Sequence, residues 1–147
     1  MSSPVGRHCL IAEADPFIAS LLARYMEDSG LECVQARTAD DVIELARRVS
    51  PAVIIIDAEL PGVAVGWEVM RALKLDAATG HIAQISCSWL SETEVRGLVH
   101  TIAGHLQKPD ISYSEFESVL RAAGVSLAAR QTTEAPWTNP HTKGQRL

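Results

Sequence analysis

The stretch that most constrains the fold is a run of β-branched residues, Val53 to Ile56, which ends in Asp57 and is closed by the turn residues Pro61 and Gly62. An unbroken apolar run of this length predicts a strand buried on both faces, as in the centre of a parallel sheet. Ligands of such sheets bind at the carboxyl ends of the strands, which places Asp57 at the expected functional edge. A simple turn cap is the alternative role of an aspartate at this position.

The chain of 147 residues fits one domain with a single hydrophobic core. No window approaches the ~18 consecutive apolar residues that a membrane span needs, and the N-terminus lacks a signal-peptide pattern. We therefore expect a cytoplasmic protein with no membrane partner. The three cysteines lie in apolar, strand-like runs without C-x-x-C spacing, which indicates buried free thiols rather than disulfides or metal ligands: Cys9, Cys33 and Cys87.

The net charge of −5 is unevenly distributed along the chain. Residues 1–124 contain 10 Lys/Arg and 17 Asp/Glu, a charge of −7, whereas residues 125–147 contain 3 and 1, a charge of +2. An acidic body disfavours nucleic-acid binding, and three basic residues in the tail are too few to argue for it. Nucleic acid is therefore not an expected partner.

Strand-like segments alternate with segments of helical periodicity along the chain. The expected strands span residues 8–12, 31–36, 52–57, 82–86 and 105–107. The helices that follow them are expected to begin near Asp15, Thr38, Gly66, Ser91 and Ser112. An Asp-Pro pair marks the first helix start, and Ser-x-x-Glu capping patterns mark the last two. The fourth helix is expected to carry Val95, Leu98, Val99 and Ile102 on its apolar side.

Five strands alternating with five helices specify a doubly wound parallel sheet with helices on both faces. Of the two common strand orders, 2-1-3-4-5 fits five strands, so we predict a flavodoxin-like α/β three-layer sandwich. Residues 8–124 form this domain. Residues 125–147 lack periodicity and hold two prolines among polar residues, so we expect a mobile tail there.

Four polar side chains fall where expected strands end, at one edge of the sheet: Glu13, Asp57, Ser86 and Lys108. Together with the segments Asp57-Ala58-Glu59-Leu60-Pro61 and Lys108-Pro109, this set resembles the receiver domains of two-component response regulators. The resemblance covers about residues 8–124. Each segment is weakly specific alone, but their order and their intervals together are specific.

The resemblance implies that Asp57 accepts a phosphoryl group from a histidine kinase, a phosphotransfer protein or a small phosphodonor. Lys108 would contact the acyl phosphate, and the Ser86 hydroxyl would bond the phosphoryl group. Mg²⁺ would be held by Glu13, Asp57 and the backbone carbonyl of Glu59, because a transferring phosphoryl group needs its charge stabilised. The resemblance also implies a cis Lys108–Pro109 bond. The alternative to these roles is that Lys108 is only a solvated surface lysine and that Ser86 is only a hydroxyl at a strand end.

The sequence departs from the family pattern at the acidic pair and at the switch position. Ala14 replaces the second of two acids after the first strand, so we expect weak Mg²⁺ binding and slow phosphorylation. Asp15 is a possible replacement ligand, although its place before a proline favours N-capping; the Glu59 side chain is another. His105 stands where the family usually has Tyr or Phe, and it adds possible pH sensitivity. Trp89 is either a partly exposed anchor or a core residue.

We therefore expect a stand-alone receiver-like protein that is not an enzyme and that signals through a downstream protein partner, with a homodimer left open. The alternative is a pseudo-receiver that binds partners without phosphorylation. A flavodoxin-type small-ligand binder would share the fold, but the sequence contains no Gly-rich phosphate loop and no nucleophile elbow.

Overall fold

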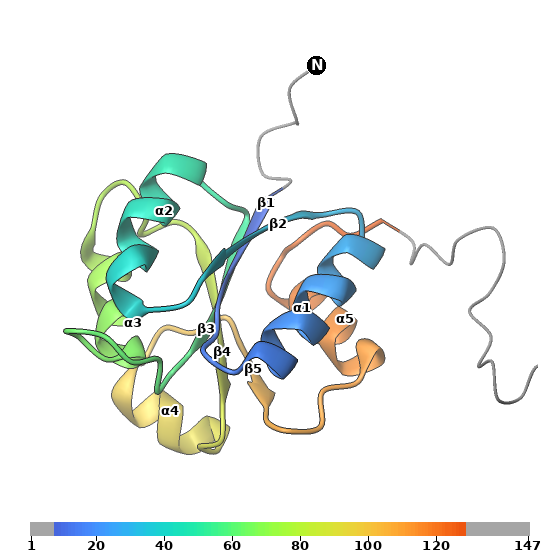
Figure 1. The fold of residues 1–147 in the computed structure, drawn as a ribbon. Helices are drawn as coiled ribbons and strands as arrows, with labels where there is room; N and C mark the ends of the chain where they lie inside the picture. Colours follow the sequence, from blue (N-terminus) through green and yellow to red (C-terminus); the bar gives the residue numbers. More distant parts are fainter. Residues whose placement is uncertain (1–7, 129–147) are drawn as a thin grey trace, which may run out of the picture.

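A parallel sheet of five strands forms the middle layer of the protein, which is described for residues 8–128 in a computed structural model (Figure 1). Its strands are β1 (His8–Ala12), β2 (Glu32–Ala36), β3 (Val53–Asp57), β4 (Ala83–Ser88) and β5 (Gly104–Gln107). Their order is β2-β1-β3-β4-β5, and every neighbouring pair is parallel. The predicted fold class and strand order are confirmed.

Helices cover both faces of this sheet (Figure 1). One face carries α1 (Pro16–Asp28) and α5 (Tyr113–Ala122); the other carries α2 (Val42–Val49), α3 (Gly66–Leu75) and α4 (Glu92–Leu98). A short 3₁₀ turn, Ala39–Asp41, precedes α2. The arrangement is the predicted three-layer sandwich.

Each residue of β3 is buried, as its unbroken apolar sequence predicts. Ile54 and Ile56 belong to the core under α2, α3 and α4, whereas Val53 and Ile55 belong to the core under α1 and α5. The central strand thus joins two hydrophobic cores, and Asp57 ends it at the sheet edge.

Helix α1 begins where the Asp-Pro pair predicts. The Asp15 carboxylate accepts hydrogen bonds from the backbone N–H groups of Phe17 (2.8 Å) and Ile18 (3.3 Å). These bonds satisfy two of the orphan donors of the first helical turn. Asp15 therefore serves as the N-cap.

Two element ends differ from the sequence-based expectation. Helix α4 ends at Leu98, so Val99 and Ile102 are buried in the connection after it and are not helical. Gly97, in the last turn, disfavours continuation of this helix. Strand β4 runs on to Ser88, past the expected end at Ser86, because its ladder with β5 continues to that residue.

The packed part of the chain continues past Gly124. Val125 is buried, Leu127 packs against the core beside α5, and the Ala128 N–H donates to the Ser29 carbonyl (2.9 Å). The body therefore includes four residues that were assigned to the tail. The rest of that expected tail, residues 129–147, lies outside the described residues.

The three cysteines are free thiols. Cys9 and Cys87 are buried as predicted, but Cys33 on the edge strand β2 is only half-buried. Within residues 8–128 no helix has the length and apolarity needed to cross a membrane.

Candidate functional site

A buried lysine joins two carboxylates at the carboxyl edge of the sheet. Lys108 Nζ lies 2.9 Å from Glu13 Oε2 and 3.1 Å from Asp57 Oδ2. Glu13 follows β1, Asp57 ends β3 and Lys108 follows β5, so strands distant in the sequence deliver the three groups to one point. The three residues are 3–6 % exposed. The surface-lysine alternative for Lys108 is thereby excluded.

The charges of these groups depend on one another because they are withdrawn from water. Burial raises the pKa of Glu13 above its ordinary value, and the hydrogen bond from Lys108 offsets part of this effect. Burial alone would lower the pKa of Lys108, but its contacts with Glu13 and Asp57 outweigh burial and raise that pKa. Lys108 is therefore charged at neutral pH and is held in place by both acids.

The turn after β3 fixes the orientation of Asp57. Its Oδ1 accepts the backbone N–H of Glu59 (2.9 Å), and its carbonyl accepts that of Leu60 (2.9 Å). Helix α3 approaches this strand end so closely that a Cβ on Gly66 would lie 2.0 Å from the Asp57 carbonyl oxygen. Both carboxylate oxygens of Asp57 thus have defined partners. The Lys108–Pro109 peptide bond is cis, as the family resemblance implied.

Ser86 lies on β4, where it pairs with Ile56, the residue before Asp57 on β3. Its hydroxyl bonds His105 Nδ1 (2.7 Å) and donates to the Gly104 carbonyl (3.5 Å). The Ser86 side chain is therefore bonded to His105.

Sequence reasoning missed a second hydroxyl, that of Ser88. Ser88 Oγ donates to Glu59 Oε2 (2.6 Å) and accepts the Leu90 N–H (2.9 Å). Residues two apart in a strand share a face, so the Ser-x-Ser spacing was the signal that would have found it. The Glu59 side chain, considered above as a replacement metal ligand, bonds this serine.

His105 connects Ser86 to the loop after β4. His105 Nε2 lies 3.2 Å from Gln107 Oε1, and Gln107 Nε2 donates to the carbonyls of Ser88 (3.1 Å) and Trp89 (3.0 Å). Because Gln107 Oε1 can only accept, His105 Nε2 donates this hydrogen bond. A chain of hydrogen bonds thus runs from His105 through Gln107 to the backbone carbonyl of Trp89. The Trp89 side chain is exposed.

The acidic groups at this edge fit Mg²⁺ only in part. Ala14 contributes no ligand, Asp15 is used as a helix cap, and residues 8–128 contain no group of three or more His, Cys, Asp or Glu arranged to hold a metal. One oxygen ligand is available, since Glu13 Oε1 is buried and has no hydrogen-bond partner among the described residues. Mg²⁺ prefers near-octahedral oxygen ligation, which these groups supply incompletely.

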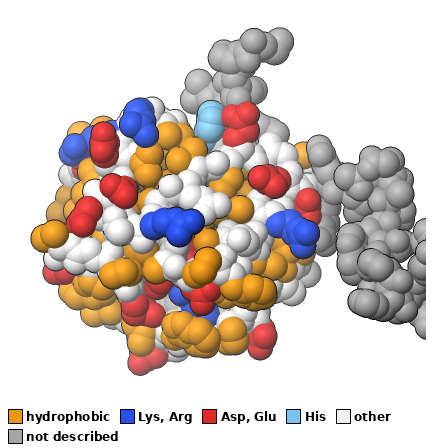
Figure 2. Space-filling model, viewed as in Figure 1, with side chains coloured by type: hydrophobic (Ala, Val, Ile, Leu, Met, Phe, Trp, Pro, Cys, Tyr) orange, Lys and Arg blue, Asp and Glu red, His pale blue; other side chains and the backbone are white. Residues whose placement is uncertain are grey.

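Exposed hydrophobic side chains surround this edge. Phe17, Val63 and Trp89 are 73 %, 97 % and 60 % exposed, and each lies in or just after a connection that leaves the carboxyl end of a strand. Figure 2 shows hydrophobic side chains along the lower edge of the molecule, with acidic side chains among them.

Comparison with known proteins gives a consistent result. The family model "Response regulator receiver domain" matches residues 9–120. The polar-differentiation response regulator DivK of Brucella ovis is 34 % identical over 77 residues, which cover 52 % of this chain and 62 % of DivK. The match thus spans less than two thirds of the length of this curated relative.

Solved structures share the fold. A sensor protein from Polaromonas sp. JS666 superposes with a TM-score of 0.69 at 28 % identity, over 80 % of this chain and 95 % of that chain. The chemotaxis response regulator CheY4 of Vibrio cholerae gives 0.70 at 19 % identity, covering 78 % and 97 %. The receiver domain of a sensor histidine kinase from Pseudomonas aeruginosa PAO1, which has a magnesium ion coordinated in its active-site cleft, gives 0.70 at 19 %, covering 81 % and 98 %.

Proposed function

Because the chain belongs to the response regulator receiver domain family, we propose that Asp57 accepts a phosphoryl group and that this modification changes contacts with a protein partner. The observation that carries the proposal is the contact of buried Lys108 with both Asp57 and Glu13. This arrangement places a fixed cation beside a carboxylate at the carboxyl edge of the sheet, where a charged group can enter from solvent.

The proposed step transfers the phosphoryl group from a donor to a carboxylate oxygen of Asp57. A P–O bond to Asp57 forms as the bond to the donor's leaving atom breaks, and the leaving group departs with that electron pair, as a carboxylate when the donor is an acyl phosphate. Charge grows on the phosphoryl oxygens during transfer, and the Lys108 ammonium, 3.1 Å from Asp57 Oδ2, is positioned to stabilise it. The protein acts as acceptor and signal carrier rather than as an enzyme.

We propose that transfer is slow because the site lacks one acid. Glu13, Asp57 and the Glu59 carbonyl are the groups that would hold Mg²⁺, and a bound Mg²⁺ would neutralise phosphoryl charge. Ala14 leaves this set short, so binding is weak. Lys108 offsets part of the charge of the two carboxylates, which lets the site exist without a metal.

The proposed donor is a histidine kinase or a phosphotransfer protein, and the proposed output is a second protein. Phe17, Val63 and Trp89 support contact with proteins, since exposed aromatic and aliphatic side chains around a site favour such interfaces. Trp89 also receives a hydrogen bond at its carbonyl from Gln107, which joins the switch residue His105 to this surface.

A second function has specific support. Ala14 and the complete pairing of Lys108 fit a pseudo-receiver that binds partners without being phosphorylated. In that case Asp57 and Glu13 serve only to anchor Lys108. The two functions differ in a single measurable event, the covalent modification of Asp57.

Incubation with a small acyl phosphate, with and without Mg²⁺, tests the proposal by intact-protein mass. We expect slow addition of one phosphoryl group, lost in Asp57→Asn, and Ala14→Asp should raise the Mg²⁺-dependent rate about tenfold, equivalent to ~1.4 kcal/mol. Ala14→Asp should also lower the unfolding free energy in metal-free buffer, because it adds a like charge beside Glu13. If neither the wild-type protein nor Ala14→Asp gains a phosphoryl group, the result favours the pseudo-receiver. An adduct rate that Ala14→Asp does not improve would show that another group replaces the missing acid.

A further inference from the structure

Cys9 on β1 and Cys33 on β2 are direct neighbours across the sheet. They are partners in the parallel register of the two strands. Neighbouring strands lie ~4.7–4.9 Å apart, which falls within the ~4.4–6.8 Å that separates Cα atoms joined by a disulfide. Both side chains face the core under α1 and α5: Cys9 belongs to that core, and Cys33 packs against it. The two thiols therefore lie side by side.

The environments of the two thiols differ in a way that assigns them different roles. Cys9 is fully buried, whereas Cys33 is half-buried and lines a shallow hollow of about 580 Å³ formed by residues 8, 27 and 30–34. A small oxidant can reach Cys33 from this hollow. Cys9 has no exposed surface and does not line the hollow.

The contact between the thiols also favours the Cys33 thiolate. A hydrogen bond from the Cys9 thiol lowers the pKa of Cys33 below its ordinary value, although its partial burial and the charge of Glu27 oppose this effect. Burial raises the pKa of Cys9. The Cys33 thiol has only a weak alternative contact, 4.0 Å to the Val34 carbonyl. Because the thiolate is the reactive form, Cys33 is the better nucleophile of the pair.

We propose that Cys9 and Cys33 form an oxidisable thiol pair, in which Cys33 reacts with a hydroperoxide and Cys9 then closes a β1–β2 disulfide. With hydrogen peroxide, the Cys33 thiolate attacks one oxygen, the O–O bond breaks, and the departing hydroxide takes a proton and leaves as water. Cys9 next gives up its proton and attacks the Cys33 sulfenic sulfur, so that an S–S bond forms and hydroxide leaves as a second water. The two thiols lose two electrons, and the peroxide gains them.

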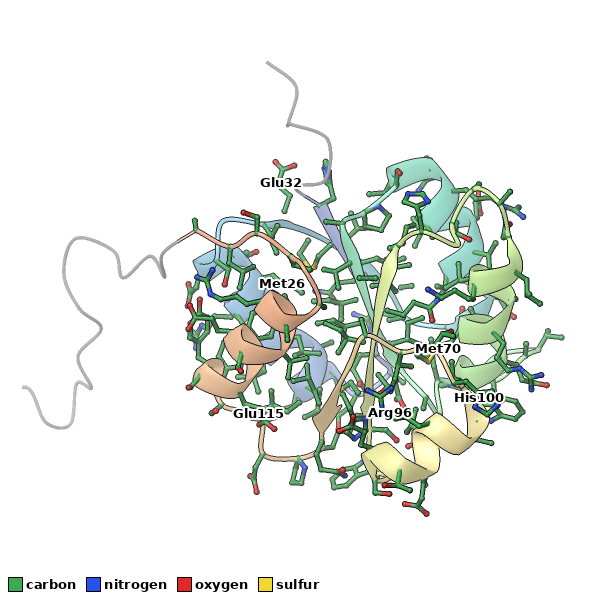
Figure 3. All side chains as sticks on the ribbon, turned by 180° about the vertical axis from the view of Figure 1, so that it is seen from behind. Met26, Glu32, Met70, Arg96, His100 and Glu115 are labelled. Atoms are coloured by element: carbon green, nitrogen blue, oxygen red, sulfur yellow. The ribbon has the colours of Figure 1, made fainter. Side chains whose placement is uncertain are left out.

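The pair is separate from the phosphoacceptor site. Cys9 and Cys33 lie near the start of their strands, whereas Asp57 lies at the end of β3. Figure 3 shows Glu32, the neighbour of Cys33, at the opposite end of the molecule from Arg96 and Glu115. Among the strands of residues 8–128, β2 lies at the edge of the sheet and pairs with β1 alone.

Peptide mapping of the full chain after treatment with hydrogen peroxide tests this proposal. Trypsin cleavage after Arg7, Arg24 and Arg37 puts Cys9 and Cys33 on separate peptides, 8–24 and 25–37, and Cys87 on a third, 75–96. After the peroxide treatment and before digestion, the remaining free thiols are blocked with a maleimide. We expect a mass loss of two hydrogens in the intact protein, a cross-linked 8–24/25–37 peptide, and reversal of both by dithiothreitol.

Variants assign the two roles. Cys9→Ala should retain oxidation but accumulate a sulfenic acid on Cys33 that dimedone traps, and Cys33→Ala should abolish the cross-link. Cys87→Ala is the matched control: Cys87 is buried and has no cysteine neighbour in the register, so its loss should leave the cross-link unchanged.

Three outcomes would overturn the proposal, and the first two need no variant. They are a native wild-type protein in which Cys33 reacts with peroxide no faster than Cys87, oxidation that joins two chains rather than β1 to β2, and a Cys9→Ala protein in which peroxide leaves no dimedone-trapped sulfenic acid on Cys33. We expect Cys33 to react at least about tenfold faster than Cys87, because burial raises the pKa of the Cys87 thiol.

Discussion

At the scale of single residues, the Lys108 side chain balances two acids that burial would otherwise make costly. Its ammonium contacts Glu13 and Asp57, and the structure gives the buried Glu13 Oε2 one further donor, the Asp15 N–H at 2.9 Å. An isolated charge withdrawn from water is strongly destabilising, whereas a paired one is tolerated. The stability of the fold is therefore coupled to the residues of the site.

Lys108→Met should lower the free energy of unfolding by ~3–5 kcal/mol at neutral pH, because it leaves two buried carboxylates without their cation. Urea unfolding measures this loss. Arg121→Met is the control, since it removes an exposed ion pair with Glu117 (3.1 Å) and should cost less than ~1 kcal/mol. Equal effects of the two substitutions would contradict a buried charge network.

Glu13→Gln should change how stability depends on pH. Burial raises the pKa of Glu13 in the folded protein, so the folded state binds the proton more tightly than the unfolded state does. The stability contributed by protonated Glu13 is fully present below its ordinary pKa and is lost as pH rises through the folded pKa. The wild-type protein should therefore gain stability relative to Glu13→Gln as pH falls from neutral toward the ordinary glutamate range. Urea unfolding at a series of pH values measures the difference, and a difference that stays constant would contradict the raised pKa.

At the scale of elements, two helical glycines should respond oppositely to the same substitution. A Cβ at Gly97 in α4 meets no atom within 4 Å, so Gly97→Ala should stabilise the protein by up to ~1 kcal/mol through helix propensity. A Cβ at Gly66 in α3 would lie 2.0 Å from the Asp57 carbonyl oxygen, so Gly66→Ala should destabilise by ~1–3 kcal/mol. Urea midpoints compare the pair. A stabilising Gly66→Ala would mean that α3 moves away from β3 easily.

Local chemistry explains which elements could be predicted from the sequence. The β-branched run of β3 and the Asp15-Pro16 cap specify their own conformations, and the structure has both as expected. The ends of β4 and α4 depend on partners instead. Ser88 continues β4 because β5 pairs with it, and no property of the β4 sequence alone contains that information.

The candidate site was predictable to a similar degree. Strand-end positions identified Glu13, Asp57 and Lys108 as residues of one edge, because parallel topology brings strand ends together. The contacts of Ser86 and Ser88 were not predictable in this way. They depend on where β4 ends relative to β3 and β5, and on the side-chain conformations of Glu59 and His105.

At the scale of the whole molecule, the segment after α5 contributes to the body. A chain ending at Gly124 should be less stable than one ending at Ala128, because it loses the burial of Val125, worth ~1.5–3 kcal/mol, and the hydrogen bond from Ala128 to Ser29. Thermal unfolding of the two truncated proteins measures the difference. Equal midpoints would show that residues 125–128 contribute no stability.

The cation that links the two acids arrives late in biosynthesis. Lys108 follows Glu13 by 95 positions and Asp57 by 51. A nascent chain that has released its first three strands from the ribosome therefore carries both carboxylates without their counter-ion, and the three-residue charge cluster is complete only after β5 and Lys108 have emerged. Under the function proposed above, a chain terminated before Lys108 would lack the cation that stabilises the transferred phosphoryl group.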